Sequence, residues 1–477
     1  MAAERPADHA AGPAAGRAAE RLVVVGGDAG GMSAASQARR RRDPSDLRIT
    51  VFERGGHTSY SACGIPYLTG GQVESAEDLI VRTPEEFRSK QDIDARIEHE
   101  VVEIDLDRRA VRVRDLAARA ERWEGFDQLI VATGAVPRRP RLPGADAQGV
   151  YGVQVLDDGI AIRRALDEDA PRRAVVVGGG YIGLEMAEAL VHRGLEVSLV
   201  DAAPQPMKTL DPDMGALVAD ALRSVGVTLY LGERLEAFET SGDRVDAVVT
   251  EARTLPADLV ILGMGVRPNT ELAQAAGIET GVTGGIVTDR RMRTRSEGVW
   301  AAGDCVETRH LVSGAPVAIA LGTHANKQGR VAGVNIGGGY ATFPGVVGTA
   351  VSKICHVEVA RTGLNEAEAE AAGFETHSVV VESTTRAGYY PGAVPMKTKL
   401  IVEQRSGRLL GAQIVGEEGA AKRIDGLAIA LWNRMTVEQM TGLDLGYAPP
   451  FSPVWDPVLI AARKAAERVE SAMHTNP

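Results

Sequence analysis

The chain has 477 residues, of which 44% are hydrophobic and 25% charged, and its formal net charge is −11. This length predicts about two to four domains, and the composition is that of a soluble globular protein with a large core. The acidic balance, without any basic domain, argues against a nucleic-acid partner. No apolar run reaches the length of a membrane span, which argues against a membrane protein.

Residues 1–20 are rich in Ala, Gly and Pro and lack the apolar stretch of a secretory signal, so we predict a disordered tail. The three cysteines, Cys63, Cys305 and Cys355, are widely spaced and form neither a CxxC motif nor a disulfide framework. We therefore predict a reducing, cytoplasmic location and no metal site.

Two stretches of the chain repeat one pattern of strand, glycine turn, helix, strand and acidic residue. The first runs from an apolar strand at 21–25 through GGDAGG to Glu53, and the second from a strand at 173–177 through GGGYIG to Asp201. In such units the glycines let the backbone approach a pyrophosphate, and the acid accepts hydrogen bonds from a ribose hydroxyl. One copy is weak evidence, but two copies indicate two dinucleotide sites.

The two glycine turns differ at their middle position. The second turn satisfies GxGxxG in full, whereas the first has Asp28 where the middle glycine is expected. An anionic side chain beside a pyrophosphate is unexpected, so either Asp28 points away or the phosphate lies elsewhere. The glycines expected at the dinucleotide sites are Gly26, Gly30 and Gly31 in the first turn and Gly178, Gly180 and Gly183 in the second.

Three further segments complete the pattern. The strand-like segment 128–135 contains Ala-Thr-Gly, and the segment 298–304 ends in Ala-Gly-Asp, whose Asp304 can hold the polyol arm of a flavin. Cys63 lies in the segment SYSACGIPY. Together these motifs resemble the flavin disulfide reductases, and within them the single-cysteine branch of coenzyme A disulfide reductases, NADH oxidases, NADH peroxidases and CoA-persulfide reductases. The resemblance covers residues 21–465.

The resemblance implies an α/β fold with two Rossmann-like dinucleotide-binding domains and a C-terminal α+β dimerisation domain. It implies an FAD-binding domain at 21–148 and 285–336, an NAD(P)H-binding domain at 149–284 and a dimerisation domain at 337–477. In the last domain we expect short strands between 357 and 415, a helix around 423–433, and a fraying helix and tail in the last dozen residues.

The resemblance also implies the cofactor contacts. Tyr181 is expected to cover the flavin until the nicotinamide displaces it, with Glu185 beside the nicotinamide. NADH is favoured over NADPH because Asp201 repels a 2′-phosphate, and the next basic residue is Lys208. The implied contacts are Gly26, Gly30, Gly31, Glu53, Thr133, Gly134 and Asp304 for FAD, and Gly178, Gly180, Tyr181, Gly183, Glu185 and Asp201 for NADH or NADPH.

The implied activity is FAD-dependent reduction of coenzyme A disulfide, or of a related small disulfide, by NAD(P)H through the thiol of Cys63. An NADH oxidase and a CoA-persulfide or polysulfide reductase remain alternatives, and a flavin-bound redox sensor is a remote one. The resemblance also implies a homodimer in which Tyr389 and Tyr447, or Tyr390 in place of Tyr389, reach across to the cysteine. A phenol there can donate a hydrogen bond to a leaving thiolate.

Several details separate the members of this branch. Peroxidases and water-forming oxidases place a histidine in the first glycine turn, where this chain has Ala29. Ser59 keeps the serine of the cysteine motif and is expected to contact the substrate, as are three basic candidates for the coenzyme A phosphates: Arg39, Arg40 and Arg82. A helix that begins after Cys63 is expected to lower the pKa of its thiol.

Overall fold

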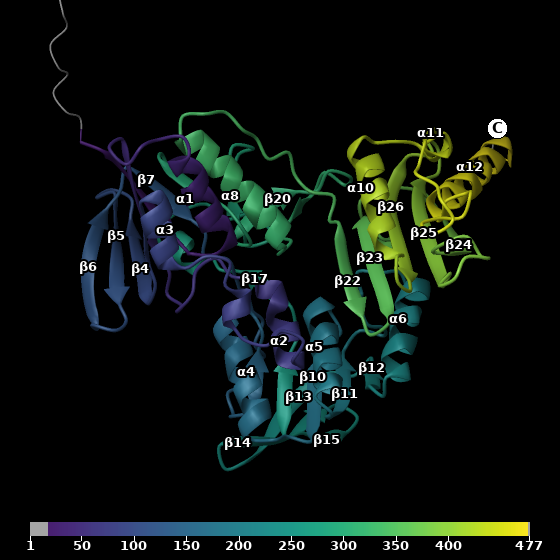
Figure 1. The fold of residues 1–477 in the computed structure, drawn as a ribbon, viewed down its shortest axis with the longest axis horizontal. Helices are drawn as coiled ribbons and strands as arrows, with labels where there is room; N and C mark the ends of the chain where they lie inside the picture. Colours follow the sequence, from purple (N-terminus) through teal and green to yellow (C-terminus); the bar gives the residue numbers. More distant parts are fainter. Residues whose placement is uncertain (1–17, 476–477) are drawn as a thin grey trace, which may run out of the picture.

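The computed structural model describes residues 18–475, so most of the predicted tail at 1–20 lies outside the described residues. Glu20, assigned to that tail, is already the first residue of strand β1. The described chain contains three five-stranded sheets with helices against them (Figure 1), which confirms the mixed α/β fold. No helix between residues 18 and 475 is long and apolar enough to cross a membrane.

The first sheet is built around the first glycine turn. All its strand pairs are parallel, and helices α1 (Ala29–Arg39) and α8 (Gly322–Ile336) lie side by side against it (Figure 1). The two helices can approach closely because Gly329 has no side chain: a Cβ atom there would overlap the carbonyl oxygen of Gly30. The strand order is β19 (Val299–Ala301), β7 (Gln128–Val131), β1 (Glu20–Val25), β2 (Leu47–Phe52) and β3 (Ile93–Arg96).

The second sheet repeats this arrangement around the second glycine turn. Its strands are again parallel, and helix α5 (Tyr181–His192) follows the turn, as α1 follows the first. A strand buried on both faces reads as a continuous apolar run, which explains why these strands could be found in the sequence. The strand order is β12 (Thr228–Leu231), β11 (Glu196–Asp201), β10 (Arg173–Val177), β16 (Leu259–Leu262) and β9 (Val150–Gly152).

The cysteine segment leaves the first unit and packs into the second. Helix α2 (Ile65–Gly70) lies between α4 (Leu156–Glu168) and α5 in Figure 1. Ile65 and Leu68 belong to the same buried core as Leu184 on α5. This packing holds Cys63, just before α2, at the junction of the two nucleotide-binding units.

The C-terminal sheet is antiparallel, and every strand but β22 is longer than any strand of the other two five-stranded sheets. The predicted strands and the helix α10 (Ile424–Trp432) are present. Strand β22 (Ala350–Ile354) was not predicted, whereas the helix expected in the last dozen residues is present as the end of helix α12 (Pro457–Thr475). The remaining strands, in the order β22-β23-β26-β25-β24, are β23 (Val357–Gly363), β26 (Leu409–Gly416), β25 (Pro395–Glu403) and β24 (Thr376–Thr384).

Candidate active site

A cavity of about 2110 Å³ runs along both glycine turns and past the cysteine. Pockets for one small ligand are typically about 300–1,000 Å³, so this cavity has room for two dinucleotides. Its wall brings together the following predicted residues from both units: Gly26, Glu53, Ser59, Cys63, Thr133, Gly134, Gly178, Gly180, Tyr181, Glu185, Asp201 and Asp304.

The first residue of each glycine turn has a left-handed backbone. Gly26 has φ +107° and Gly178 has φ +106°, and a Cβ atom on either would overlap a neighbouring backbone carbonyl. Only glycine tolerates this combination. Gly180 has no atom near the place of a Cβ, so its backbone is open to the cavity. The second turn therefore has the bare backbone that a pyrophosphate requires, whereas the first turn carries the Asp28 side chain at the corresponding position.

The other predicted glycines act through packing. Gly30, Gly31 and Gly183 do not line the cavity. A Cβ atom on Gly31 or Gly183 would overlap the carbonyl oxygen of the first glycine of its own turn. These glycines therefore allow the helix to start close to the strand.

Each acidic residue is held by its own glycine turn. Glu53 Oε2 accepts a 2.7 Å hydrogen bond from the N–H of Gly27, and Asp201 Oδ2 accepts a 2.5 Å bond from that of Gly179. The second oxygen of each carboxylate accepts a hydrogen bond from an N–H two residues further along the chain. The two carboxylates therefore have equivalent positions at the ends of β2 and β11.

Asp28 does not leave the cavity, although that was one of the two expected outcomes. It lines the wall, and burial together with the charge of Glu53 raises its pKa to about 6. The backbone N–H groups of Ala29 and Tyr60 partly offset this rise in the pKa of Asp28. Asp28 therefore lies between the first glycine turn and the cysteine segment.

Asp304 offers a hydrogen-bond acceptor that nothing in the described chain satisfies. Its Oδ1 is buried without a partner, and burial raises the pKa of Asp304 to about 6. A buried polar atom of this kind calls for a bound group. Asp304 follows β19 and faces the cavity beside the first glycine turn, so its position and chemistry fit a hydroxyl of the flavin polyol arm.

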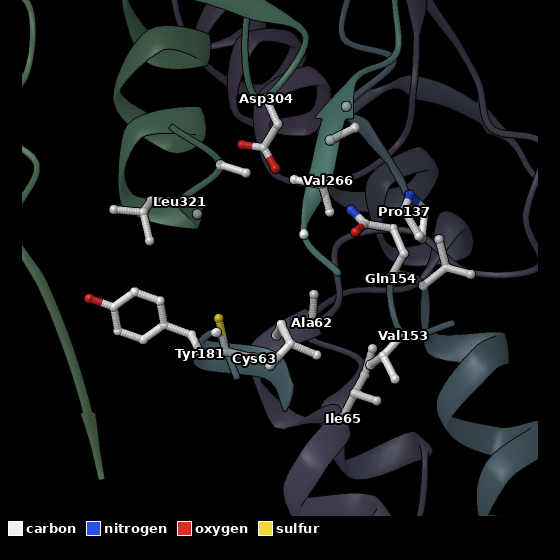
Figure 2. Close-up of a pocket in the computed structure, with 18 of the residues that line it drawn as sticks. Ala62, Cys63, Ile65, Pro137, Val153, Gln154, Tyr181, Val266, Asp304 and Leu321 are labelled. Carbon is white, nitrogen blue, oxygen red and sulfur yellow. The ribbon is translucent and has the colours of Figure 1, made fainter. Parts of the chain in front are cut away.

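The Cys63 thiol opens on the cavity. Figure 2 shows its sulfur pointing into the space toward which the Asp304 carboxylate projects from the other side. Burial raises the pKa of the Cys63 thiol, and the charges of Glu185 and Asp304 raise it further. The expected lowering by the start of α2, a helix of only six residues, is therefore not found in the polypeptide itself, where burial and two nearby carboxylates raise the pKa of the thiol.

Tyr181 and Glu185 lie on the first turns of α5. Tyr181 lines the cavity close to Cys63 in Figure 2. Ser352 Oγ, on β22, donates a 2.7 Å hydrogen bond to Glu185 Oε1. Burial raises the pKa of Glu185, and the hydrogen bond from Ser352 partly offsets that rise.

The two predicted tyrosines of the C-terminal domain lie beside each other but away from the cavity. Tyr389 is 77% exposed and Tyr447 is 49% exposed, and neither lines the cavity wall. Partial burial and the adjacent Tyr389 phenol raise the pKa of Tyr447. A single chain therefore brings the two phenols together without bringing them to its own cysteine. The fallback residue, Tyr390, is also exposed.

The three arginines predicted to bind coenzyme A do not line the cavity. The Arg39 guanidinium donates to four backbone carbonyls, those of Gln91, Arg42, Leu47 and Asp92, so its donors are used within the fold. Arg82 lies over the ring of Phe87, 5.1 Å from its centroid. Arg40 is exposed at the end of α1. Basic residues that do line the cavity are Arg54, Arg114, Arg138, Lys208, Lys353 and Lys422.

The comparisons with known proteins agree with this architecture. Residues 20–329 match the pyridine nucleotide-disulphide oxidoreductase family, and residues 349–457 match the dimerisation domain of that family. The chain belongs to the pyridine nucleotide-disulphide oxidoreductase family. Membership implies FAD and NAD(P)H as its redox partners.

Individual relatives resemble the chain over nearly its whole length. It is 40% identical over 443 residues to the CoA-dependent NAD(P)H sulfur oxidoreductase of Pyrococcus abyssi, covering 93% of this chain and 97% of the relative. It is 30% identical over 451 residues to the coenzyme A disulfide reductase of Staphylococcus haemolyticus, covering 94% and 99%. The structure of an NAD-dependent persulfide reductase from A. fulgidus matches with a TM-score of 0.92 and 40% identity, covering 94% of this chain and 84% of that one.

Proposed function

We propose that the protein uses NAD(P)H to reduce the sulfur–sulfur bond of a coenzyme A disulfide or persulfide, with Cys63 as the only redox thiol. The observation that carries the proposal is the position of the Cys63 sulfur on the cavity wall, between the two glycine turns and facing the Asp304 side. Cys305 is fully buried and Cys355 lies outside the cavity wall, so neither supports a dithiol site.

The residues of the first unit fit FAD. Glu53 is positioned for the ribose of its adenosine and Asp304 for the polyol arm. Bound there, FAD would supply two-electron transfer from NAD(P)H to sulfur. Tyr181, Glu185 and the second glycine turn are positioned for the nicotinamide nucleotide.

Cys63 performs the sulfur chemistry. Its thiolate attacks one sulfur of the substrate, forming a Cys63–S bond as the substrate S–S bond breaks and the other sulfur leaves with its electron pair. A phenol from Tyr447 or Tyr389 of a partner copy can donate a hydrogen bond to that leaving thiolate. We propose a homodimer for this reason, since within one chain the phenols lie outside the cavity.

The acceptor can be a persulfide as well as a disulfide, because both need only one attacking thiolate. The 40% identity to sulfur and persulfide reductases, against 30% to a coenzyme A disulfide reductase, favours the persulfide. Cavity-lining cations such as Lys353 and Lys422, rather than Arg39, Arg40 or Arg82, are the available contacts for coenzyme A phosphates.

The test is a steady-state comparison of acceptors. Purified holoenzyme with NADH is given coenzyme A disulfide, coenzyme A persulfide, or oxygen alone. We expect kcat/KM to be highest for one of the two sulfur acceptors. Turnover with oxygen that exceeds both would make the protein an NADH oxidase, and slow turnover with every acceptor would make it a redox sensor.

A further inference from the structure

A row of three polar side chains crosses the middle of the C-terminal sheet and faces the second nucleotide-binding unit. Arg361, Gln413 and Lys399 stand opposite one another on β23, β26 and β25, because Arg361 pairs with Gln413 and Gln413 pairs with Lys399. All three are buried. Buried polar groups on a sheet face must be satisfied by partners, and here several of the partners come from another domain.

The partners outside the C-terminal domain lie at the start of helix α6 (Pro212–Ser224), which Figure 1 shows below the end of the C-terminal sheet. Within the domain, Arg361 also pairs with Glu368 at 2.8 Å. The Arg361 guanidinium donates a 3.0 Å hydrogen bond to the carbonyl of Thr209. Gln413 binds Asp211 twice, accepting from its N–H at 2.9 Å and donating to its carboxylate at 2.7 Å.

Lys399 completes the row as a buried cation held by three carboxylates. Its Nζ lies 3.1 Å from Asp211, 2.9 Å from Asp213 and 3.1 Å from Glu366, and its side chain is only 4% exposed. Burial disfavours the ammonium, but its hydrogen bonds to these carboxylates, together with their charge, outweigh burial and hold the pKa of Lys399 above its ordinary value. Such an ion pair fixes geometry more than it adds stability.

The segment held by this row is part of the nicotinamide nucleotide site. The N–H of Met207, whose φ is +49°, donates a 2.7 Å hydrogen bond to the carbonyl of Gly179 in the second glycine turn. Lys208 and Thr209 line the cavity, and Thr209 lies beside Tyr181. Residues 207–211 are therefore attached at one end to the glycine turn and at the other to the C-terminal sheet.

We propose that Arg361, Gln413 and Lys399 are positioning residues for NAD(P)H: they hold residues 207–211, and through them Tyr181 and the second glycine turn, in the geometry that binds the nucleotide. The C-terminal domain thereby sets nucleotide affinity through residues that line no part of the cavity. This inference rests on the proposed use of NAD(P)H at the second glycine turn.

The experiment compares Lys399→Met with Lys397→Met in the FAD-loaded enzyme. Lys397 lies on the same strand, two residues earlier, but pairs with Glu382 within the C-terminal sheet at 2.7 Å. We expect Lys399→Met to raise the NADH dissociation constant and KM by about 3- to 30-fold, the range of coupling through packed networks. Its kcat at saturating NADH stays within about twofold, since no group in contact with the reacting atoms is removed. Lys397→Met leaves all three parameters unchanged.

A double variant keeps the test decisive if Lys399→Met does not fold. Asp213→Asn with Glu366→Gln changes two partly exposed carboxylates and leaves Lys399 with Asp211 alone. It should raise the NADH dissociation constant by at least about threefold. A lower melting temperature with unchanged NADH binding in either variant overturns the inference and makes the row purely structural. Failure of the unmodified holoenzyme to bind NADH would instead overturn the proposed function.

Discussion

Ser352 and Glu185 connect the C-terminal domain to the cysteine through one carboxylate. Ser352 Oγ, on β22, donates a 2.7 Å hydrogen bond to Glu185 Oε1, on the helix that follows the second glycine turn. The same carboxylate is, after burial, the largest contributor to the raised pKa of Cys63. The ionisation of the thiol therefore depends on a residue of the nicotinamide half of the site.

Replacing Glu185 should make the thiol more acidic. Glu185→Gln removes a negative charge near the sulfur, so the thiolate costs less free energy and the pKa of Cys63 falls. The rate of Cys63 alkylation by iodoacetamide in the NADH-reduced holoenzyme should reach half its maximum at a lower pH than in the unmodified protein. Glu188→Gln, on the same helix, is the matched control, because Glu188 does not contribute to the Cys63 shift. Identical profiles for the unmodified protein and Glu185→Gln would contradict this electrostatic account.

Replacing the thiol should separate the two halves of the reaction. Cys63→Ser should lower kcat for the sulfur acceptor by at least about 1,000-fold, as the loss of a nucleophile usually does, while NADH still bleaches the flavin absorbance in stopped flow. Cys355→Ser, a partly buried thiol outside the cavity wall, serves as the control and should keep its activity. Sulfur reduction that survives in Cys63→Ser would refute a thiol mechanism.

The tyrosine pair should act on the cysteine of the other copy. Tyr447→Phe should lower kcat by about 100-fold, within the range for loss of a proton donor. Mixed dimers of Cys63→Ser and Tyr447→Phe chains decide the geometry. If each phenol serves the partner subunit, one of the two sites in a mixed dimer is intact, and about half of the normal activity returns. If the phenol acted within its own chain, both sites would be defective and no activity would return.

The paired glycine turns could be predicted because their backbone geometry restricts which residues fit. A left-handed first glycine such as Gly26, and a helix that starts against the strand, leave glycine as the only residue that fits. The acids Glu53 and Asp201 could be predicted for a related reason: each ends a buried strand beside its turn. Each glycine turn and its acid lie within about thirty residues of one another in the sequence, and the structure places both as the pattern predicts.

The arginines could not be assigned in the same way. Nothing local distinguishes Arg39, which donates to four backbone carbonyls, from an arginine free to meet a phosphate. The partners of Lys399 lie in segments around 211 and 366, so the sequence gives no indication that this lysine is buried. The raised pKa of Cys63 likewise comes from burial by the fold and from the charges of Glu185 and Asp304, which are distant in the chain.

Asp304 should destabilise the flavin-free protein as the pH rises. Its pKa in the folded chain is about 6, against about 3.9 in an unfolded chain. Because this pKa is raised, the folded state is favoured while the group is protonated, and stability is lost as the pH rises from about 4 to 6. Above that range the ionised carboxylate lowers the free energy of unfolding by about 3 kcal/mol.

After removal of the flavin, Asp304→Asn should raise the melting temperature at pH 7 but not at pH 4. It should also weaken FAD rebinding, measured by fluorescence quenching. Equal melting temperatures at pH 7 would contradict the unpartnered position of this carboxylate.

Lys208 should decide how well NADPH is used. Asp201 at the end of β11 repels a 2′-phosphate, but Lys208 lines the same cavity and follows Met207, which is hydrogen-bonded to the glycine turn. A cation held there can pair with the phosphate that Asp201 disfavours. Lys208→Ala should therefore raise KM for NADPH by about 2- to 5-fold, the value of one exposed charge pair, and leave KM for NADH within error. Lys353→Ala, on another part of the cavity wall, should not discriminate between the two nucleotides. An equal change for NADH and NADPH in Lys208→Ala would show that the lysine contacts something other than the 2′-phosphate.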